Sequence, residues 1–126
     1  MDRYKLKHIL EFAEEYDNRV EQVVIGKVLI GELSDDKDRI KSVVRVIKLE
    51  HFFSKEHKKI YHAILELYRE SKRIDIISVK AKLEETGELE DIGGLEYLAD
   101  LVEIAETEKD DKFKEYIKSI NNRRGK

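Results

Sequence analysis

The chain has 126 residues, the length of one domain, and no cysteine, which excludes a disulfide framework and a zinc site built on thiolates. Charged residues make up 42% of the chain but nearly cancel to a net charge of −3, which argues against a surface for general nucleic-acid binding. No apolar run approaches the roughly 20 residues that span a bilayer, and the charged first residues lack the apolar core of a signal peptide. We therefore expect a cytoplasmic protein that makes no membrane contact.

The first third of the chain predicts two helices. The sequence contains no proline and only six glycines, so long helices are sterically permitted almost throughout. Apolar residues recur at i, i+3, i+4 and i+7 over Leu6–Ala13, which predicts an amphipathic leader helix. Tyr16–Asn18 interrupts this pattern, and its asparagine is expected to cap a second helix over Arg19–Gly31. The second helix is apolar nearly all round and should be buried; Gly26 within it suggests the close approach of a neighbouring helix.

The middle of the chain predicts a third and a fourth helix. Ile40–Ile47 repeats the helical apolar spacing, and Leu49–Phe53 follows as a short apolar turn. Ser54 is placed to cap a helix over Lys55–Ser71. The apolar stripe of that helix is broad, which suits a helix that packs on more than one neighbour.

The last third predicts three shorter helices. After an extended crossing at Arg73–Ile77, Ser78 is expected to cap a helix that ends at Thr86, with Gly87 as its left-handed C-terminal cap. A loop closed by two glycines leads to a helix marked by Leu95, Leu98, Leu101 and Val102. The final helix is expected over Asp110–Asn121, followed by a polar, frayed tail. The predicted core is a set drawn from several helices: Val24, Val28, Phe52, Phe53, Tyr61, Ile64, Leu65, Tyr68 and Leu98.

The residue types that could bind nucleotide or metal, or act in catalysis, do not occur at the spacings that such sites require. No stretch fits a phosphate-binding loop, because Gly26-Lys27 is followed by valine inside a predicted helix, so no nucleotide hydrolysis, catalytic residue or cofactor is expected. His57 and His62 are five residues apart and point differently on a helix, so we interpret the histidines as surface or boundary residues rather than metal ligands. The carboxylates over Glu84–Asp91 are interpreted as a solvated helix end. The last cations are interpreted as part of a linker: Arg123, Arg124 and Lys126.

An ordered series of segments carries a resemblance to a known family. The series comprises Glu21–Leu29, Phe52-Phe53, His57, Ile60–Tyr68, Ile74-Asp75, Val79, Leu83, Gly87–Leu89 and Gly93–Leu101. In this order and spacing the chain resembles the amino-terminal domain of DnaB-type bacterial replicative helicases, over roughly residues 18–120. Three positions depart from the family pattern, which usually has proline there: Asn18, Glu50 and Arg73.

The resemblance implies an all-α fold, a compact multi-helix orthogonal bundle with a C-terminal helical hairpin. It divides the chain into a leader helix (1–17), a globular helical domain (18–105) and a hairpin helix with a frayed tail (106–126). It also implies a non-catalytic collar domain, which mediates subunit association in a hexameric ring and docks primase or a loader during DNA replication. The full-length protein of the family is an ATP-dependent DNA helicase. Strong direct DNA binding by this domain is not expected.

Other functions stay open on the sequence. The chain is either part of a helicase or a free-standing partner or decoy that binds helicase or primase. A small helical DNA-binding regulator and a metal-dependent enzyme using His57 and His62 are weaker alternatives, because the charge balance and the histidine spacing count against them.

The last helix carries the predicted self-association site. One apolar stripe contains Phe113, Tyr116, Ile117 and Ile120, and no later helix of the chain covers it. The stripe either folds back on the helix that contains Leu98 and Leu101 or packs on another chain as a weak dimer. Should association not depend on this stripe, the leader helix with its apolar residues from Leu6 to Leu10 is the next candidate.

Overall fold

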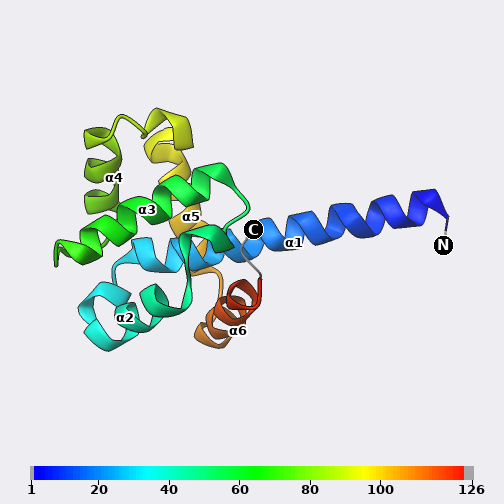
Figure 1. Cartoon of the computed structure of the whole chain (residues 1–126), viewed down its shortest axis with the longest axis horizontal. Coiled ribbons are helices and arrows are strands. Elements are labelled where there is room, and N and C mark those ends of the chain that lie inside the picture. Colours follow the sequence, from blue (N-terminus) through cyan, green and yellow to red (C-terminus); the bar gives the residue numbers. More distant parts are fainter. Residues whose placement is uncertain (1, 124–126) are drawn as a thin grey trace.

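The computed structural model describes residues 2–123 as a set of helices, with no strand among those residues (Figure 1). The all-helical fold expected from the sequence is therefore confirmed. The α-helices are α1 (Arg3–Ile30), α2 (Lys37–Val46), α3 (Lys55–Arg69), α4 (Ile76–Glu85), α5 (Gly94–Glu106) and α6 (Asp110–Asn121). Three short 3-10 helices join them: η1 (Leu33–Asp35), η2 (Leu49–His51) and η3 (Glu90–Ile92).

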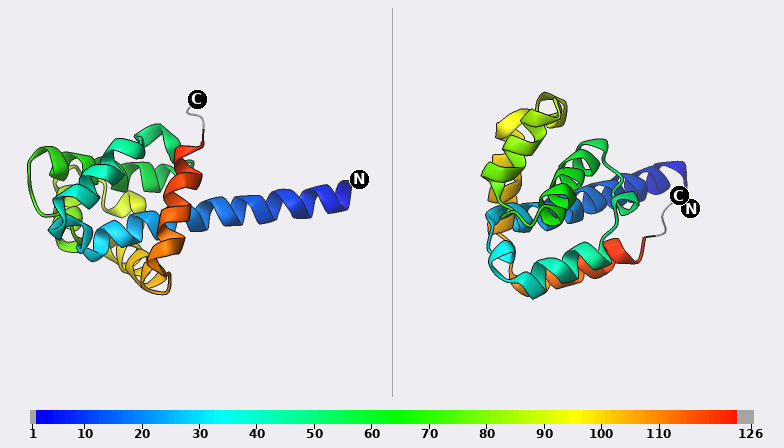
Figure 2. Two further views of the ribbon diagram at one scale, coloured as in Figure 1. Left: turned by 90° about the horizontal axis from the view of Figure 1, so that it is seen from below. Right: turned by 60° about the vertical axis from the view of Figure 1, so that its left-hand side comes forward.

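The first two predicted helices are a single helix, α1, so the break expected at Tyr16–Asn18 is wrong. Neither glycine nor proline occurs in that segment, and its polar residues continue the helix without a steric penalty. The exposure of α1 nevertheless changes along its length: residues 2–16 are all exposed, whereas most residues from Val20 to Ile30 are buried. The N-terminal half of α1 projects away from the body that the other helices form (Figures 1 and 2).

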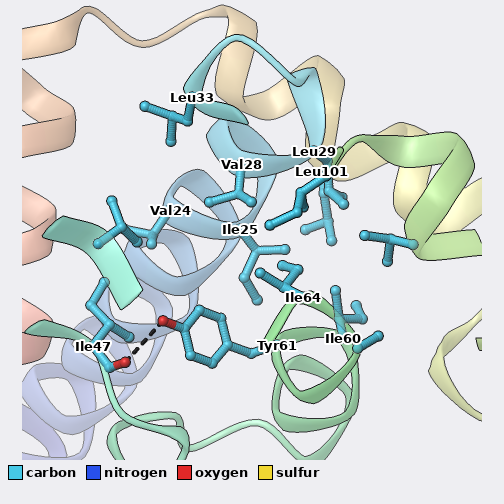
Figure 3. Packing of buried hydrophobic residues seen from close by; sticks show 14 of the residues in the cluster. Val24, Ile25, Val28, Leu29, Leu33, Ile47, Ile60, Tyr61, Ile64 and Leu101 are labelled. Carbon is cyan, nitrogen blue, oxygen red and sulfur yellow. Dashed lines mark hydrogen bonds between the residues drawn. The ribbon is translucent and has the colours of Figure 1, made fainter. Parts of the chain in front are cut away.

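The hydrophobic core surrounds the C-terminal half of α1. Val24, Ile25 and Val28 face Tyr61 and Ile64 of α3 (Figure 3), and the five side chains are at most 1% exposed. The Tyr61 hydroxyl donates a hydrogen bond of 2.9 Å to the Ile47 carbonyl. The one polar atom that this ring brings into the core therefore has a partner. The helix that is apolar all round is thus the central helix, as its sequence pattern predicts.

The predicted core residues fall into three groups. Six are buried: Val24, Val28, Phe52, Tyr61, Ile64 and Leu98. Leu65 and Tyr68 are only partly buried at the edge of the core. Phe53 is 58% exposed, so its assignment to the core is corrected. The backbone at Phe52 is extended, and successive side chains of an extended chain point to opposite sides, so only Phe52 points inward.

Gly26 is where α5 comes closest to α1. A Cβ at this position would overlap the Leu101 carbonyl oxygen and would lie 2.7 Å from the Cβ of Ala105. The mid-helix glycine therefore serves close helix packing, as its position in an apolar helix suggests. Gly31 ends α1 with a φ of 97°, a left-handed conformation that side chains rarely adopt.

Side-chain hydrogen bonds cap the N-termini of α3 and α4. The Ser54 hydroxyl accepts from the His57 amide at the start of α3, as predicted. At α4, however, Asp75 is the N-cap and Ser78 is its reciprocal partner: the Ser78 amide donates to the Asp75 carboxylate and the Asp75 amide to the Ser78 hydroxyl. This capping box begins α4 at Ile76, three residues earlier than a cap at Ser78 would begin it.

The last helix packs on a different surface from either one expected. A short link joins α5 to α6, but α6 lies mainly across α1 and also along α2 (Figure 2). The edge of the Tyr16 ring meets the ring of Tyr116 with centroids 6.2 Å apart. Since α1 is one long helix, it offers α6 a surface that two separate helices would not provide.

Candidate interaction surfaces

A buried carboxylate joins the central helix to two distant segments. Glu21 of α1 is 1% exposed. One of its oxygens accepts from the Phe53 amide at 2.8 Å and from Arg123 Nη1 at 2.6 Å. The other contacts His57 Nδ1 at 2.8 Å and accepts from the Ser54 amide at 3.3 Å. The contacts tie α1, the start of α3 and the end of α6 together.

The histidine in this polar cluster is fully buried, so the interpretation of His57 as a surface or boundary residue is wrong. Its Nδ1–H faces the Glu21 carboxylate, and its Nε2 lies 2.6 Å from the Tyr97 hydroxyl of α5. In the tautomer with its proton on Nδ1, the ring accepts a hydrogen bond from the tyrosine hydroxyl at Nε2. Burial is tolerated because both ring nitrogens have partners.

Arg123 fixes the end of α6, and its interpretation as a linker residue is also wrong. Its side chain is 8% exposed. Besides Glu21, it donates to the His51 carbonyl at 3.0 Å and to the Asp17 carbonyl at 3.2 Å. Its guanidinium lies 4.1 Å from the centre of the exposed Phe53 ring, a cation–π contact. The other two tail cations, Arg124 and Lys126, lie outside the described residues.

The electrostatics of the cluster favour an ionised Glu21. Burial on its own raises the pKa of this carboxyl group. The hydrogen bonds from His57, the Phe53 amide and Arg123 outweigh burial and hold the pKa below its ordinary value of 4.5. The cluster consequently holds the helices together, and its carboxylate is charged near neutral pH. It has no open face for a substrate, since Glu21 and His57 are both inaccessible.

The sequence carries one signal for this cluster. Glu21 lies in a helix that is otherwise apolar nearly all round, which indicates a buried charge that must have partners. Its partners could not be named in advance, because they lie 32 to 102 residues away along the chain.

The predicted self-association stripe is mostly buried by packing within the chain. Phe113, Tyr116 and Ile120 are 3%, 7% and 0% exposed. Only Ile117 is partly accessible; it lines an apolar hollow between α6 and α2 together with Val46. The stripe is therefore an internal packing surface in this structure, which corrects its assignment as the main site for a second chain.

Most of the large apolar side chains that are exposed within residues 2–123 lie on the projecting half of α1. Leu6, Ile9 and Leu10 are 49%, 51% and 55% exposed, and the Tyr4 and Phe12 rings are 72% exposed. Leu6, Ile9 and Leu10 lie on one face of the helix, and contiguous exposed apolar residues are typical of an interaction surface. Elsewhere among the described residues, the exposed large apolar side chains are Phe53, Ile77 and Leu95.

A second accessible feature is an open hollow beside η1. Its walls come from α2 and from the end of α3, and cations surround it: Lys37, Lys41, Arg69, Lys72 and Arg73. Aspartates in the same wall offset part of this charge. Within residues 2–123, the structure contains no cluster of three or more potential metal ligands. Over the same residues, none of the helices combines the length and apolarity needed to span a membrane.

Comparison with known proteins gives consistent matches. The family described as DnaB-like helicase N terminal domain matches residues 13–122. The chain is 35% identical over 97 residues to the replicative DNA helicase DnaB of Leifsonia xyli, covering 77% of this chain and 20% of that protein. It is 34% identical over 91 residues to the same helicase of Mycobacterium leprae, covering 72% and 14%. The chain thus spans about a fifth or less of these two relatives.

A solved structure matches the fold as well. The crystal structure of the N-terminal domain of DnaB helicase from Mycobacterium tuberculosis superposes with a TM-score of 0.67 at 31% identity. The superposition covers 82% of this chain and 66% of that one. The matched family region begins at residue 13 and so leaves most of the projecting half of α1 outside it.

Proposed function

Because the chain belongs to the DnaB-like helicase N terminal domain family, we propose that it serves as the non-catalytic collar domain of a replicative DNA helicase. In this role it associates with other subunits of the hexameric ring and docks primase or a helicase loader in the cytoplasm during DNA replication. The observation that carries the proposal is the match over residues 13–122, which contains the whole core and the buried polar cluster except Arg123.

The chemistry of the chain supports a binding role rather than a catalytic one. The printed sequence contains no phosphate-binding loop. The buried polar cluster around Glu21 is closed to substrates and joins helices to each other. The exposed half of α1 and the open hollow lined by charged residues are surfaces that another protein can contact. We accordingly expect no stoichiometric binding of ATP with magnesium, which isothermal titration measures.

Titration of the chain with the helicase-binding domain of primase from the same organism tests the docking role. We expect a saturable complex with one site per chain, measured by isothermal titration calorimetry. Lys41→Glu beside the hollow and Ile77→Glu on α4 map the docking surface, and circular dichroism verifies that both variants are folded. Absence of a complex with primase and with the loader, at concentrations up to about 1 mM, a weak-binding affinity limit, would refute the docking role.

A further inference from the structure

The N-terminal half of α1 is a helix without a tertiary partner. Its residues 2–16 are all exposed, and the helix reaches the body only near Tyr16, whose ring contacts α6. Isolated helices of this length are marginal in water, since packing of an apolar face supplies most helical stability. A projecting helix with an uncovered apolar stripe is therefore stabilised by whatever covers that stripe.

The apolar stripe is continuous and narrow. Leu6, Ile9, Leu10 and Ala13 follow the spacing i, i+3, i+4 and i+7, and at about 100° per residue they lie on one face of the helix. Tyr4, although 72% exposed, lies on the opposite face. The stripe has the geometry of one seam between two helices rather than of a helix buried on all sides.

The charges along the projecting half are segregated. Its first turns carry the cations Arg3, Lys5 and Lys7, and its later turns carry the carboxylates Glu11, Glu14 and Glu15. Within residues 2–16, none of these six side chains forms a salt bridge. At about 100° per residue, Arg3, Lys7 and Glu14 lie on one flank of the apolar stripe.

This arrangement is complementary to itself when one copy is reversed. We propose that the projecting half of α1 pairs with the same segment of a second copy of this chain, antiparallel and centred near Leu10. The basic first turns of each copy then lie beside the acidic later turns of the other, while the apolar stripes face each other. A parallel pair would instead place like charges together, which is unfavourable.

The self-pairing deepens the assembly role proposed above and rests on it for its biological purpose. The interface is small: about 15 residues at roughly 1.5 Å per residue form a seam only about 20 Å long. Such a pair buries less than the roughly 1,600 Å² typical of stable complexes. The isolated chain is therefore expected to form a weak, concentration-dependent dimer, which strengthens wherever other contacts already hold two copies together.

Charge reversal combined with sedimentation equilibrium tests the pairing. Because a symmetric dimer contains each ion pair twice, Lys7→Glu is expected to weaken dimerisation roughly tenfold. The double variant Lys7→Glu/Glu14→Lys restores the complement and should return to within about threefold of the wild type. Ile9→Gln/Leu10→Gln should abolish the dimer, whereas Tyr4→Gln on the opposite face should leave it unchanged. These side chains are exposed, so the body is expected to stay folded, as circular dichroism will verify.

Cross-linking determines the direction of the helices, because the chain has no cysteine of its own. In an antiparallel pair, a mixture of Leu6→Cys and Ala13→Cys chains should form disulfide-linked dimers more readily than either variant alone. Stronger cross-linking of each variant with itself would overturn the antiparallel pairing. A wild type that is monomeric at millimolar concentration, or a dimer insensitive to Ile9→Gln/Leu10→Gln, would overturn the use of this surface.

The same variants separate this inference from the proposed function. Primase binding by a monomeric chain would leave the docking role intact and refute the pairing. A dimer that follows the charge-reversal pattern but binds neither primase nor loader would support the pairing and refute the docking role.

Discussion

Removal of the buried carboxylate should destabilise the whole domain. Glu21→Ala deletes the acceptor for two backbone amides, for His57 and for Arg123. It also leaves the arginine, now 8% exposed, without its main counter-charge. Breaking one side of a buried ion pair typically costs about 3–5 kcal/mol, and partial movement of Arg123 toward solvent should keep the loss within that range. We therefore expect the free energy of unfolding to fall by about 3–5 kcal/mol.

Urea denaturation followed by circular dichroism measures this change. Arg123→Gln is the matched control, because it removes one charged hydrogen bond and leaves the other partners of Glu21 in place; its expected cost is about 1.5–3 kcal/mol. A loss below about 1 kcal/mol for Glu21→Ala, the size of an ordinary surface or boundary change, would refute the view that this cluster holds the helices together.

The pH dependence has a definite sign. The folded-state pKa of Glu21 is below its ordinary value of 4.5, so its contribution is fully present above about pH 4.5 and is lost as the pH falls through the lowered pKa. Glu21→Gln has no titrating group there. The stability gap between wild type and this variant should narrow below pH 4.5, whereas a gap that is constant from pH 7 to pH 3 would contradict the ionised cluster.

Four further substitutions, one of them a control, test the packing by urea denaturation. Gly26→Ala should destabilise by about 1–3 kcal/mol or more through overlap with α5, although alanine favours an isolated helix by up to about 1 kcal/mol; a gain in stability would contradict the close approach. Tyr61→Phe should cost about 1 kcal/mol for its buried hydrogen bond, and a neutral result would show that the hydroxyl is not buried with its acceptor. Ile64→Ala should cost about 2–5 kcal/mol and more than Leu65→Ala, because only Ile64 is fully buried; the reverse order would mean that α3 presents a different face.

Helix identity and the central core could be predicted from the sequence because both depend on local periodicity. The all-round apolar pattern of residues 19–31 placed that segment at the centre of the fold, and Gly26 indicated a close helix contact. The predicted helix end at Tyr16–Asn18 is wrong because the apolar pattern changes face there, and a change of face in one sequence looks the same as the end of a helix. In the structure the helix continues while its environment changes from solvent to protein.

The contacts that fix the tertiary structure were less predictable. Glu21, His57 and Arg123 are far apart in sequence, and although the apolar surroundings of Glu21 indicate a buried charge, His57 and Arg123 each resemble a surface residue. Phe53 was misplaced because two adjacent phenylalanines look equally apolar, although an extended backbone turns only one of them inward. The apolar stripe of α6 was correctly identified as a packing surface in need of a partner, but periodicity does not name the partner. That partner is α1, whose two halves have different apolar patterns and are predicted as separate helices.

Competition for primase tests the docking role of this domain most directly. A fluorescently labelled helicase-binding domain of primase is first bound to the replicative helicase of the same organism, and the isolated chain is then titrated in while the anisotropy is followed. We predict that the chain displaces the helicase from the primase domain in a saturable manner, without added nucleotide. A primase domain that stays bound to the helicase at a large excess of folded chain would contradict the proposal that this domain carries the docking surface.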